Sequence, residues 1–301
     1  MTGVQTCALP ISFTITPAIS ESYNNGHHNL TQYYIKQQWK HWGLTASFLF
    51  VVVLVVIPPA FRTLAGNYAL AAELLPILLF TRLLVFPINF GSAVSQGINK
   101  PEYQTFALFF EQTSMLASFF ILLNPAWGVI TVLGADYALT LYVFAKFPAF
   151  LVKLFTQWLF VKRTIKFSVA PSFYQTFIAP ILTAIPIYIL LWLPMQYFNV
   201  VAARSGSNLT MPIVILALVL LCALFLFPMF VLFPFYGLFG GWDDEGLDAF
   251  KKAAKICGPS GFLVKVMARL TEWGHKYSPL GNKFPIPHEK AKLEENILSK
   301  K

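Results

Sequence analysis

Six long apolar stretches constrain this sequence more than any other feature. A helix needs about 20 apolar residues to cross the hydrocarbon core of a bilayer. The stretches cover residues 43–61, 70–95, 104–123, 127–150, 173–198 and 211–239. Since each of them can form a membrane-spanning helix, we predict an all-α fold, a polytopic membrane bundle of about six transmembrane helices.

The composition favours the same fold class. Hydrophobic residues make up 56% of the chain and charged residues only 12%. A typical soluble domain has about 25% charged residues. The 30 Phe side chains are more apolar surface than one soluble core of this size needs, whereas lipid can solvate them. The composition therefore excludes a soluble enzyme.

Charges in the loops predict the orientation of the stretches. Basic residues concentrate on the cytoplasmic side of membrane proteins. The tail after residue 239 carries 11 of the 22 Lys and Arg residues, and the loops around Lys100 and Lys162 are also basic. The remaining loops hold only Arg62 and Arg204. We therefore expect a multi-pass protein of the cytoplasmic cell membrane with both ends of this chain in the cytoplasm.

The net charge of +9 also bears on the partners of the chain. Basic residues next to a membrane attract its anionic lipids, and no nucleic-acid-binding motif accompanies them. We therefore expect the lipid bilayer as a partner and no nucleic acid.

We divide the chain into four parts. Residues 1–12 (MTGVQTCALPIS) look like a translated sequencing adapter, so we expect them to be non-native and the natural protein to begin further upstream. Residues 13–42 form a cytoplasmic or interfacial segment, residues 43–239 the six-helix transmembrane domain, and residues 240–301 a cytoplasmic basic tail.

The tail contains an amphipathic helix. Its apolar face holds Leu263, Val266, Leu270 and Trp273. A second face holds Lys265, Arg269, Glu272 and Lys276. This pattern favours a helix that lies on the inner leaflet, and packing against cytoplasmic loops is the alternative.

Ionisable residues inside the stretches are the candidate functional residues. Each costs about 2.5–3.5 kcal/mol at the centre of a bilayer, so it should face a cavity or a partner. Arg82 shares a helix face with Asn89, and Asp136 shares one with Thr140. The ionisable candidates are Glu73, Arg82, Glu111, Asp136 and Lys146.

Two interpretations of these residues stay open. In one, they line a hydrated cavity that binds a polar or anionic substrate group. The cavity set is Arg82, Asn89, Glu111, Asp136, Thr140 and Lys146. In the other, Arg82 pairs with Asp136 and Glu111 pairs with Lys146, and the pairs only fix helix packing. Recovery of transport in a variant lacking both Arg82 and Asp136 would favour the second interpretation.

No pattern predicts an enzyme. All five His residues lie outside the apolar stretches, and the sequence has no Ser/His/Asp set and no glycine-rich phosphate loop. Asp243, Asp244 and Glu245 could hold a metal ion, but acidic residues at the start of a helix more often complement its dipole. We therefore expect no catalytic residue, no cofactor and no metal site.

Several short motifs follow one another at characteristic spacings in the first half of the chain. A Pro-x-x-Ser-Glu element comprises Pro17, Ser20 and Glu21. It is followed by Pro58–Leu64 with Gly66-Asn67-Tyr68-Ala69, and by turns at Asn99-Lys100-Pro101 and Asn124-Pro125. With this order and spacing, residues 16–165 resemble the multidrug/oligosaccharidyl-lipid/polysaccharide (MOP) exporter superfamily, especially its O-antigen type polysaccharide flippases.

The resemblance implies a fold and an activity. Members have two six-helix lobes around a central cavity, a MATE-like arrangement, so this chain would be a C-terminal fragment whose partner is the missing N-terminal lobe. The activity would be transport of lipid-linked oligosaccharide or polysaccharide precursors across the membrane by alternating access. If an ion gradient drives it, Glu111 and Asp136 would be the protonation sites.

Three other functions are kept as alternatives. A multidrug or cation exporter of the same superfamily would favour acidic over basic cavity residues. A membrane-embedded glycosyltransferase or polymerase of surface polysaccharide synthesis would need a long soluble loop with active-site residues. A scaffold would not need charges inside the membrane. The even mix of Arg82 and Lys146 with Asp136 and Glu111 favours the flippase.

Overall fold

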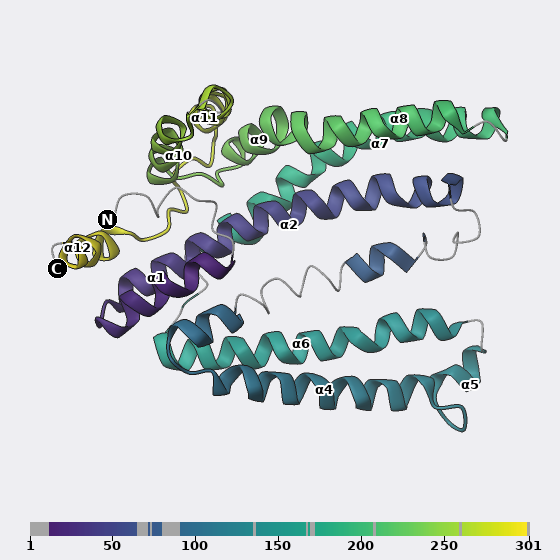
Figure 1. Ribbon diagram of the computed structural model, residues 1–301, viewed down its shortest axis with the longest axis horizontal. Coiled ribbons are helices and arrows are strands. Elements are labelled where there is room, and N and C mark those ends of the chain that lie inside the picture. The colour runs from purple at the N-terminus through teal and green to yellow at the C-terminus, as the bar shows by residue number, and fades with distance from the viewer. Residues whose placement is uncertain are drawn as a thin grey trace. The chain divides into compact units, whose positions relative to one another are not determined.

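The computed structural model describes residues 12–64, 72, 74–79, 91–134, 137–166, 168, 172–206, 209–258 and 261–299 (Figure 1). Within these ranges the regular structure is helical and contains no strand. Four helices are long and apolar enough to cross a membrane, and the bent pair Thr210–Leu226 and Pro228–Leu238 makes a fifth candidate. The four are α2 (His28–Leu64), α4 (Glu102–Leu123), α6 (Ala138–Ile165) and Tyr174–Ser205. The predicted fold class, an all-α polytopic membrane helix bundle, is confirmed.

The remaining elements are short or lie outside the candidate spans. Tyr174–Ser205 consists of a π-helical turn, Tyr174–Ile178, followed by α7 (Ala179–Ser205). The bent pair consists of α8 (Thr210–Leu221), the π-helical turns Cys222–Leu226 and Pro228–Leu232, and α9 (Phe233–Leu238). The others are α1 (Ser12–Asn24), α5 (Val129–Leu133), α10 (Asp244–Ile256), α11 (Gly261–Lys276) and α12 (Glu289–Leu298).

Five of the six predicted stretches fall in these candidate spans. The sixth, 70–95, lies largely outside the described residues. The stretch 127–150 is wrong in its bounds, because α5 ends at Leu133 and is followed by Gly134, whose φ of 95° suits a glycine and interrupts the helix. After this break α6 begins at Ala138 and runs to Ile165.

The stretch 211–239 is bent and not a single straight helix. Its two halves meet at 43°. Pro228 has no N–H for the preceding turn, and its ring clashes with the carbonyl of the residue four positions earlier. The π-helical turns on either side of Phe227 absorb the mismatch.

The chain divides into two compact units. One contains Gln37–Glu73 and Val169–Ile286, and the other contains Pro10–Lys36, Leu74–Ser168 and Pro287–Lys301. The first unit has an apolar core to which α2 contributes Phe48 and Val56, and α7 contributes Ile187 and Phe198.

A close backbone approach fixes α2 against the start of the Tyr174–Ser205 helix. A β-carbon at Gly43 would lie 1.9 Å from the carbonyl oxygen of Thr176. Only glycine allows two backbones to come this close. Gly43 therefore sets the packing at this end of the first unit.

The second unit is organised around an antiparallel pair, α4 and α6 (Figure 1). At one end the rings of Tyr103 and Phe160 stack with centroids 4.6 Å apart. At the other end the rings of Phe119 and Tyr142 stack at 5.4 Å. These contacts place the start of α4 beside the end of α6, as a hairpin requires.

The turn between α1 and α2 explains how the N-terminal segment folds back. Gly26 has a φ of 78° and ends α1. Ser22 and Thr31 then meet through their buried hydroxyl oxygens, 2.8 Å apart. α12 closes the same unit, since the Glu294 carboxylate accepts a hydrogen bond of 2.7 Å from the Leu30 N–H in the first turn of α2.

Candidate functional site

The middle of α4 carries a buried carboxylate. Glu111 and Ala107 are the buried residues of this helix, whereas neighbouring Phe109 and Phe110 are exposed. Oε2 of Glu111 lies 2.7 Å from Nζ of Lys153 on α6, and the two side chains are 10% and 13% exposed. This contact is an ion pair without hydrogen-bond geometry at Oε2. Pairing is how charges inside a membrane are normally accommodated.

The predicted pairing of Glu111 with Lys146 is therefore wrong in its partner. Nζ of Lys146 instead lies 4.2 Å from the ring centroid of Tyr142, a cation–π contact. Lys146 and Lys153 are seven residues apart and share a face of α6. The predicted stretch ended at residue 150, so Lys153 was not considered, whereas the observed helix continues to Ile165.

A buried amide lies one turn beyond Lys153. Gln157 is 2% exposed, and within the described part of the chain its amide oxygen and nitrogen have no hydrogen-bond partner. The amide lies against the backbone at Gly91, where a β-carbon would be 2.5 Å from its Oε1. A buried amide with unused donors and acceptor costs free energy unless a ligand or water satisfies it.

These side chains form one polar stripe between α4 and α6. Intervals of four and seven residues return a helix to nearly the same direction, so Lys146, Lys153 and Gln157 lie on one face of α6. Glu111 meets this face from α4. We call Glu111, Lys146, Lys153 and Gln157 the polar seam. It brings a carboxylate, two ammonium groups and an amide together along one pair of apolar helices.

Other predicted site residues do not join this seam. Arg82, Asn89 and Asp136 lie outside the described residues, as does Glu73, so their predicted roles stay predictions. Thr140 is half-buried in the first turn of α6. It is six residues before Lys146, which points it in a different direction.

The family-like motif residues lie on α1. Pro17 and Glu21 are exposed and Ser20 is half-buried. Oγ of Ser20 accepts a hydrogen bond of 3.1 Å from the Asn24 amide. Between them, buried Ile19 packs against Gly97, where a β-carbon would lie 2.6 Å from its Cγ2. The packing contact in this segment is thus made by Ile19 and not by the three motif residues.

A second buried ion pair lies in the first unit. Nζ of Lys40 on α2 is 3.2 Å from Oδ1 of Asp243, and the side chains are 1% and 7% exposed. The Lys40 ammonium also lies 5.0 Å from the ring centroid of Trp242. Asp243 accepts further hydrogen bonds from the N–H groups of Gly246 at 3.0 Å and Ile286 at 3.5 Å.

The pair controls the titration of Asp243. Burial alone would raise the pKa of this carboxyl, but the Lys40 charge and the hydrogen bonds from Gly246 and Ile286 outweigh burial. The pKa of Asp243 is therefore held below its ordinary value. From the sequence, Asp243, Asp244 and Glu245 are expected at the start of a helix, where they complement its dipole. Asp244 and Glu245 lie in the first turn of α10, and Asp243 directly precedes it and accepts the Gly246 N–H, so the expected place of all three at a helix start is confirmed.

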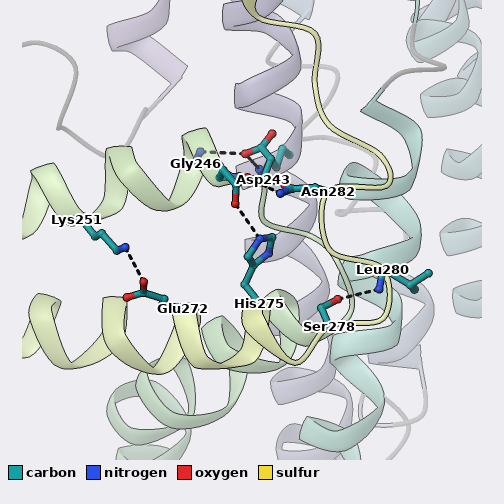
Figure 2. Close-up of polar contacts among 10 residues, drawn as sticks. Asp243, Gly246, Lys251, Glu272, His275, Ser278, Leu280 and Asn282 are labelled. Carbon is teal, nitrogen blue, oxygen red and sulfur yellow. Dashed lines mark hydrogen bonds and ion pairs between the residues drawn. The ribbon is translucent and has the colours of Figure 1, made fainter.

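Polar contacts tie the tail together around this pair (Figure 2). The Asp244 carboxylate accepts a hydrogen bond from the Asn282 amide and lies 3.2 Å from Nε2 of His275. Lys251 on α10 is 2.8 Å from Glu272 on α11. The acidic run at the start of α10 is thus engaged with protein side chains, and in the described ranges no group of three His, Cys, Asp or Glu is arranged to hold a metal ion.

Comparisons with family models, curated proteins and solved structures found no match for this chain. Its function must therefore be argued from the polar seam, the ion pairs and the membrane spans.

Proposed function

We propose that this membrane protein is a flippase of the MOP superfamily type that moves lipid-linked oligosaccharide or polysaccharide precursors across the cytoplasmic membrane by alternating access. The observation that supports it most is the polar seam inside two apolar helices. A charged pair and an unsatisfied amide at this place are costly for a protein that only has to pack. They suit a chain that must bind a polar group within the bilayer.

The chemistry of the seam fits the head group of such a precursor. A polyprenyl carrier links its sugar through anionic phosphate. Phosphate oxygens can compete with the Glu111 carboxylate for the Lys153 ammonium, since charge-assisted hydrogen bonds are the stronger ones. The Gln157 amide has two N–H donors and an acceptor oxygen, which match sugar hydroxyls. The lipid tail would stay in the bilayer while the head group crosses.

A contact within the first unit supports an even number of crossings in the whole membrane domain. Lys40 precedes the first predicted span and Asp243 follows the last, yet the two side chains touch. This contact supports a proposal in which both ends of the membrane domain lie on one side. The described residues supply up to five candidate spans, and the proposal takes the predicted stretch 70–95 as the sixth. The proposal takes that side as the cytoplasm, because the basic residues of the tail favour it.

The proposal includes a second helical lobe as a partner, as the family resemblance implies. With two lobes, the polar seam would face a shared cavity and the exposed Phe-rich faces of α4 would face lipid.

A multidrug exporter is the second candidate. It would bind organic cations and would favour carboxylates over ammonium groups along its cavity. Lys153 adds a second ammonium beside Lys146 and leaves Glu111 as the carboxylate of the seam. This excess of positive charge favours an anionic head group over a cation.

Binding of a defined probe tests the proposal. The probe is a short polyprenyl diphosphate that carries an oligosaccharide, and native mass spectrometry measures its binding to the full chain in detergent. The variant Glu111→Gln with Lys153→Met removes both charges and leaves neither buried alone. We expect its binding to be at least about tenfold weaker, because a charge-assisted hydrogen bond contributes about 1.5–3 kcal/mol.

The control for this test removes an exposed pair of the same charges. Lys251→Met with Glu272→Gln alters a pair that is 42% and 52% exposed and should bind the probe like the unaltered chain. Unchanged binding by the Glu111 and Lys153 variant would overturn the proposed site. Preferential binding of a quaternary ammonium dye would favour the exporter.

A further inference from the structure

Helix α11 has three distinct faces, and one of them is buried against α9. Its buried residues are small: Gly261, Ala268, Thr271 and Gly274. A β-carbon at Gly274 would lie 2.2 Å from the carbonyl oxygen of Pro234. One at Gly237 on α9 would lie 2.8 Å from that of Thr271. This face is therefore fully used by packing within the first unit.

The second face is apolar and mostly exposed, with Val266 and Leu270 half-buried along its middle. With about 100° between successive residues, six apolar side chains fall within one arc of about 100°. Phe262 is 72% exposed, Leu263 52%, Trp273 60% and Tyr277 61%. The six are Phe262, Leu263, Val266, Leu270, Trp273 and Tyr277. We call this set the apolar arc.

The third face is basic and borders the apolar arc. Lys265, Arg269 and Lys276 are exposed along one edge of it. Glu272, the acidic residue on the same side, is occupied by Lys251 of α10 at 2.8 Å (Figure 2). Among the described residues, no carboxylate pairs with Lys265, Arg269 or Lys276. The edge therefore presents uncompensated positive charge beside uncovered apolar surface.

The position of α11 places both faces at the end of the membrane domain. α9 is the last part of the last candidate span, and α11 packs directly on it. Figure 1 shows α11 beyond α8 and α9 and drawn nearly end-on, while α8 lies along the picture. The helix therefore crosses the direction of the last span, as a helix in the interfacial plane of a bilayer would.

We propose that α11 is an interfacial helix that inserts its apolar arc into the lipid surface and binds anionic phospholipid head groups through Lys265, Arg269 and Lys276. A helix with Trp and Phe on one face and Lys and Arg beside it binds membranes in this orientation. Each basic residue near an anionic surface strengthens binding about fivefold. The buried small-residue face fixes this lipid contact to the end of the last span, so lipid composition at the surface acts on the membrane domain. This proposal does not depend on the transported substrate.

Spin labels on the full chain test the insertion. In a background with the three native Cys replaced by Ser, single cysteines replace Phe262, Trp273 or Glu272, and the protein is placed at one chain per nanodisc. We expect labels at 262 and 273 to be accessible to oxygen and protected from a water-soluble nickel chelate. The label at 272 should show the opposite. A water-exposed label at 273 would overturn the proposal.

Lipid composition tests the charge requirement. Nanodiscs are prepared from phosphatidylcholine with and without phosphatidylglycerol, and the depth of the label at 273 is measured in each. We expect deeper insertion with phosphatidylglycerol, and loss of that difference in Lys265→Glu, Arg269→Glu, Lys276→Glu. A control with Lys252, Lys255 and Lys283 replaced by Glu has the same change in net charge and should keep the difference.

Two outcomes would contradict the inference. Equal depth in both lipids would show that the basic edge does not bind anionic head groups. Protection of position 273 that appears only when two chains share a nanodisc would assign the apolar arc to a second copy of the protein.

Discussion

At the scale of single residues, two buried ion pairs among the described residues connect helices to other parts of the chain. Glu111–Lys153 joins α4 to α6, and Lys40–Asp243 joins α2 to the segment before α10. Removal of one partner of a buried pair costs about 3–5 kcal/mol, whereas replacement of both by apolar groups is often neutral. Each pair therefore makes the position of one helix depend on another.

The Lys40–Asp243 pair predicts acid sensitivity of the first unit. The pKa of Asp243 is lower in the folded chain than in the unfolded chain, so its stabilisation is complete above the ordinary carboxyl pKa of about 3.9. It is lost as pH falls through the folded value. We expect thermal stability in detergent to drop below about pH 4, as measured by tryptophan fluorescence.

The variant Asp243→Asn checks this cause. It should be less stable than the unaltered chain at neutral pH and should lose less stability on acidification, since the titrating group is gone. An acid-induced loss of the same size in both proteins would assign the effect to other carboxyls.

Sequence reasoning identified some of these residues and missed their partners. Glu111 stood out because a carboxylate in an apolar stretch is expensive, but Lys153 lay beyond the predicted span end and was passed over. Asp243 was expected at the start of a helix, where it does accept the Gly246 N–H. Its contact with Lys40 was missed, because it joins positions far apart in the chain. The periodicity of a sequence predicts which residues share a face of one helix, whereas pairs between distant helices depend on tertiary packing.

At the scale of helices, close backbone contacts and helix breaks define the architecture. The apolar stretches were predictable from composition, since length and hydropathy set a span directly. Their ends were not. Gly134 broke one predicted span, Pro228 bent another, and α6 extended far past its predicted end. Each of these depends on local backbone conformation, which the number of apolar residues in a stretch does not predict.

The contact of Gly43 with Thr176 gives a prediction at this scale. Gly43→Ala would place its β-carbon 1.9 Å from the Thr176 carbonyl oxygen, so α2 must move away from the Tyr174–Ser205 helix. We expect a loss of about 1–3 kcal/mol of stability, the usual cost of overpacking, measured as a lower midpoint of thermal unfolding in detergent.

The neighbouring exposed residue supplies the control. Thr45→Ala lies on the same helix and is exposed, so its stability should change by no more than about 0.5 kcal/mol. Equal stability of Gly43→Ala and Thr45→Ala would mean that the close backbone approach is absent in the folded protein.

At the scale of the whole molecule, the protein is an all-α membrane helix bundle, and we propose that both ends of its membrane domain lie on one side. The contact between Lys40 and Asp243, which flank the predicted membrane domain, favours an even number of crossings between them. In the second unit, the stacked rings of Tyr103 and Phe160 place the start of α4 beside the end of α6. The loop charges predict an even number of crossings with both ends in the cytoplasm, and this orientation stays a prediction.

Labelling from each side of the membrane tests this central claim most directly. Single cysteines replace Lys100, Lys162, Ser278 or Trp127 in the chain without native Cys, and a membrane-impermeant maleimide is applied to intact cells and to inverted vesicles. The account predicts labelling of positions 100, 162 and 278 from the cytoplasmic side and of position 127 from the other. Labelling of positions 100 and 162 from opposite sides would contradict the hairpin, the even number of crossings and the transporter built on them.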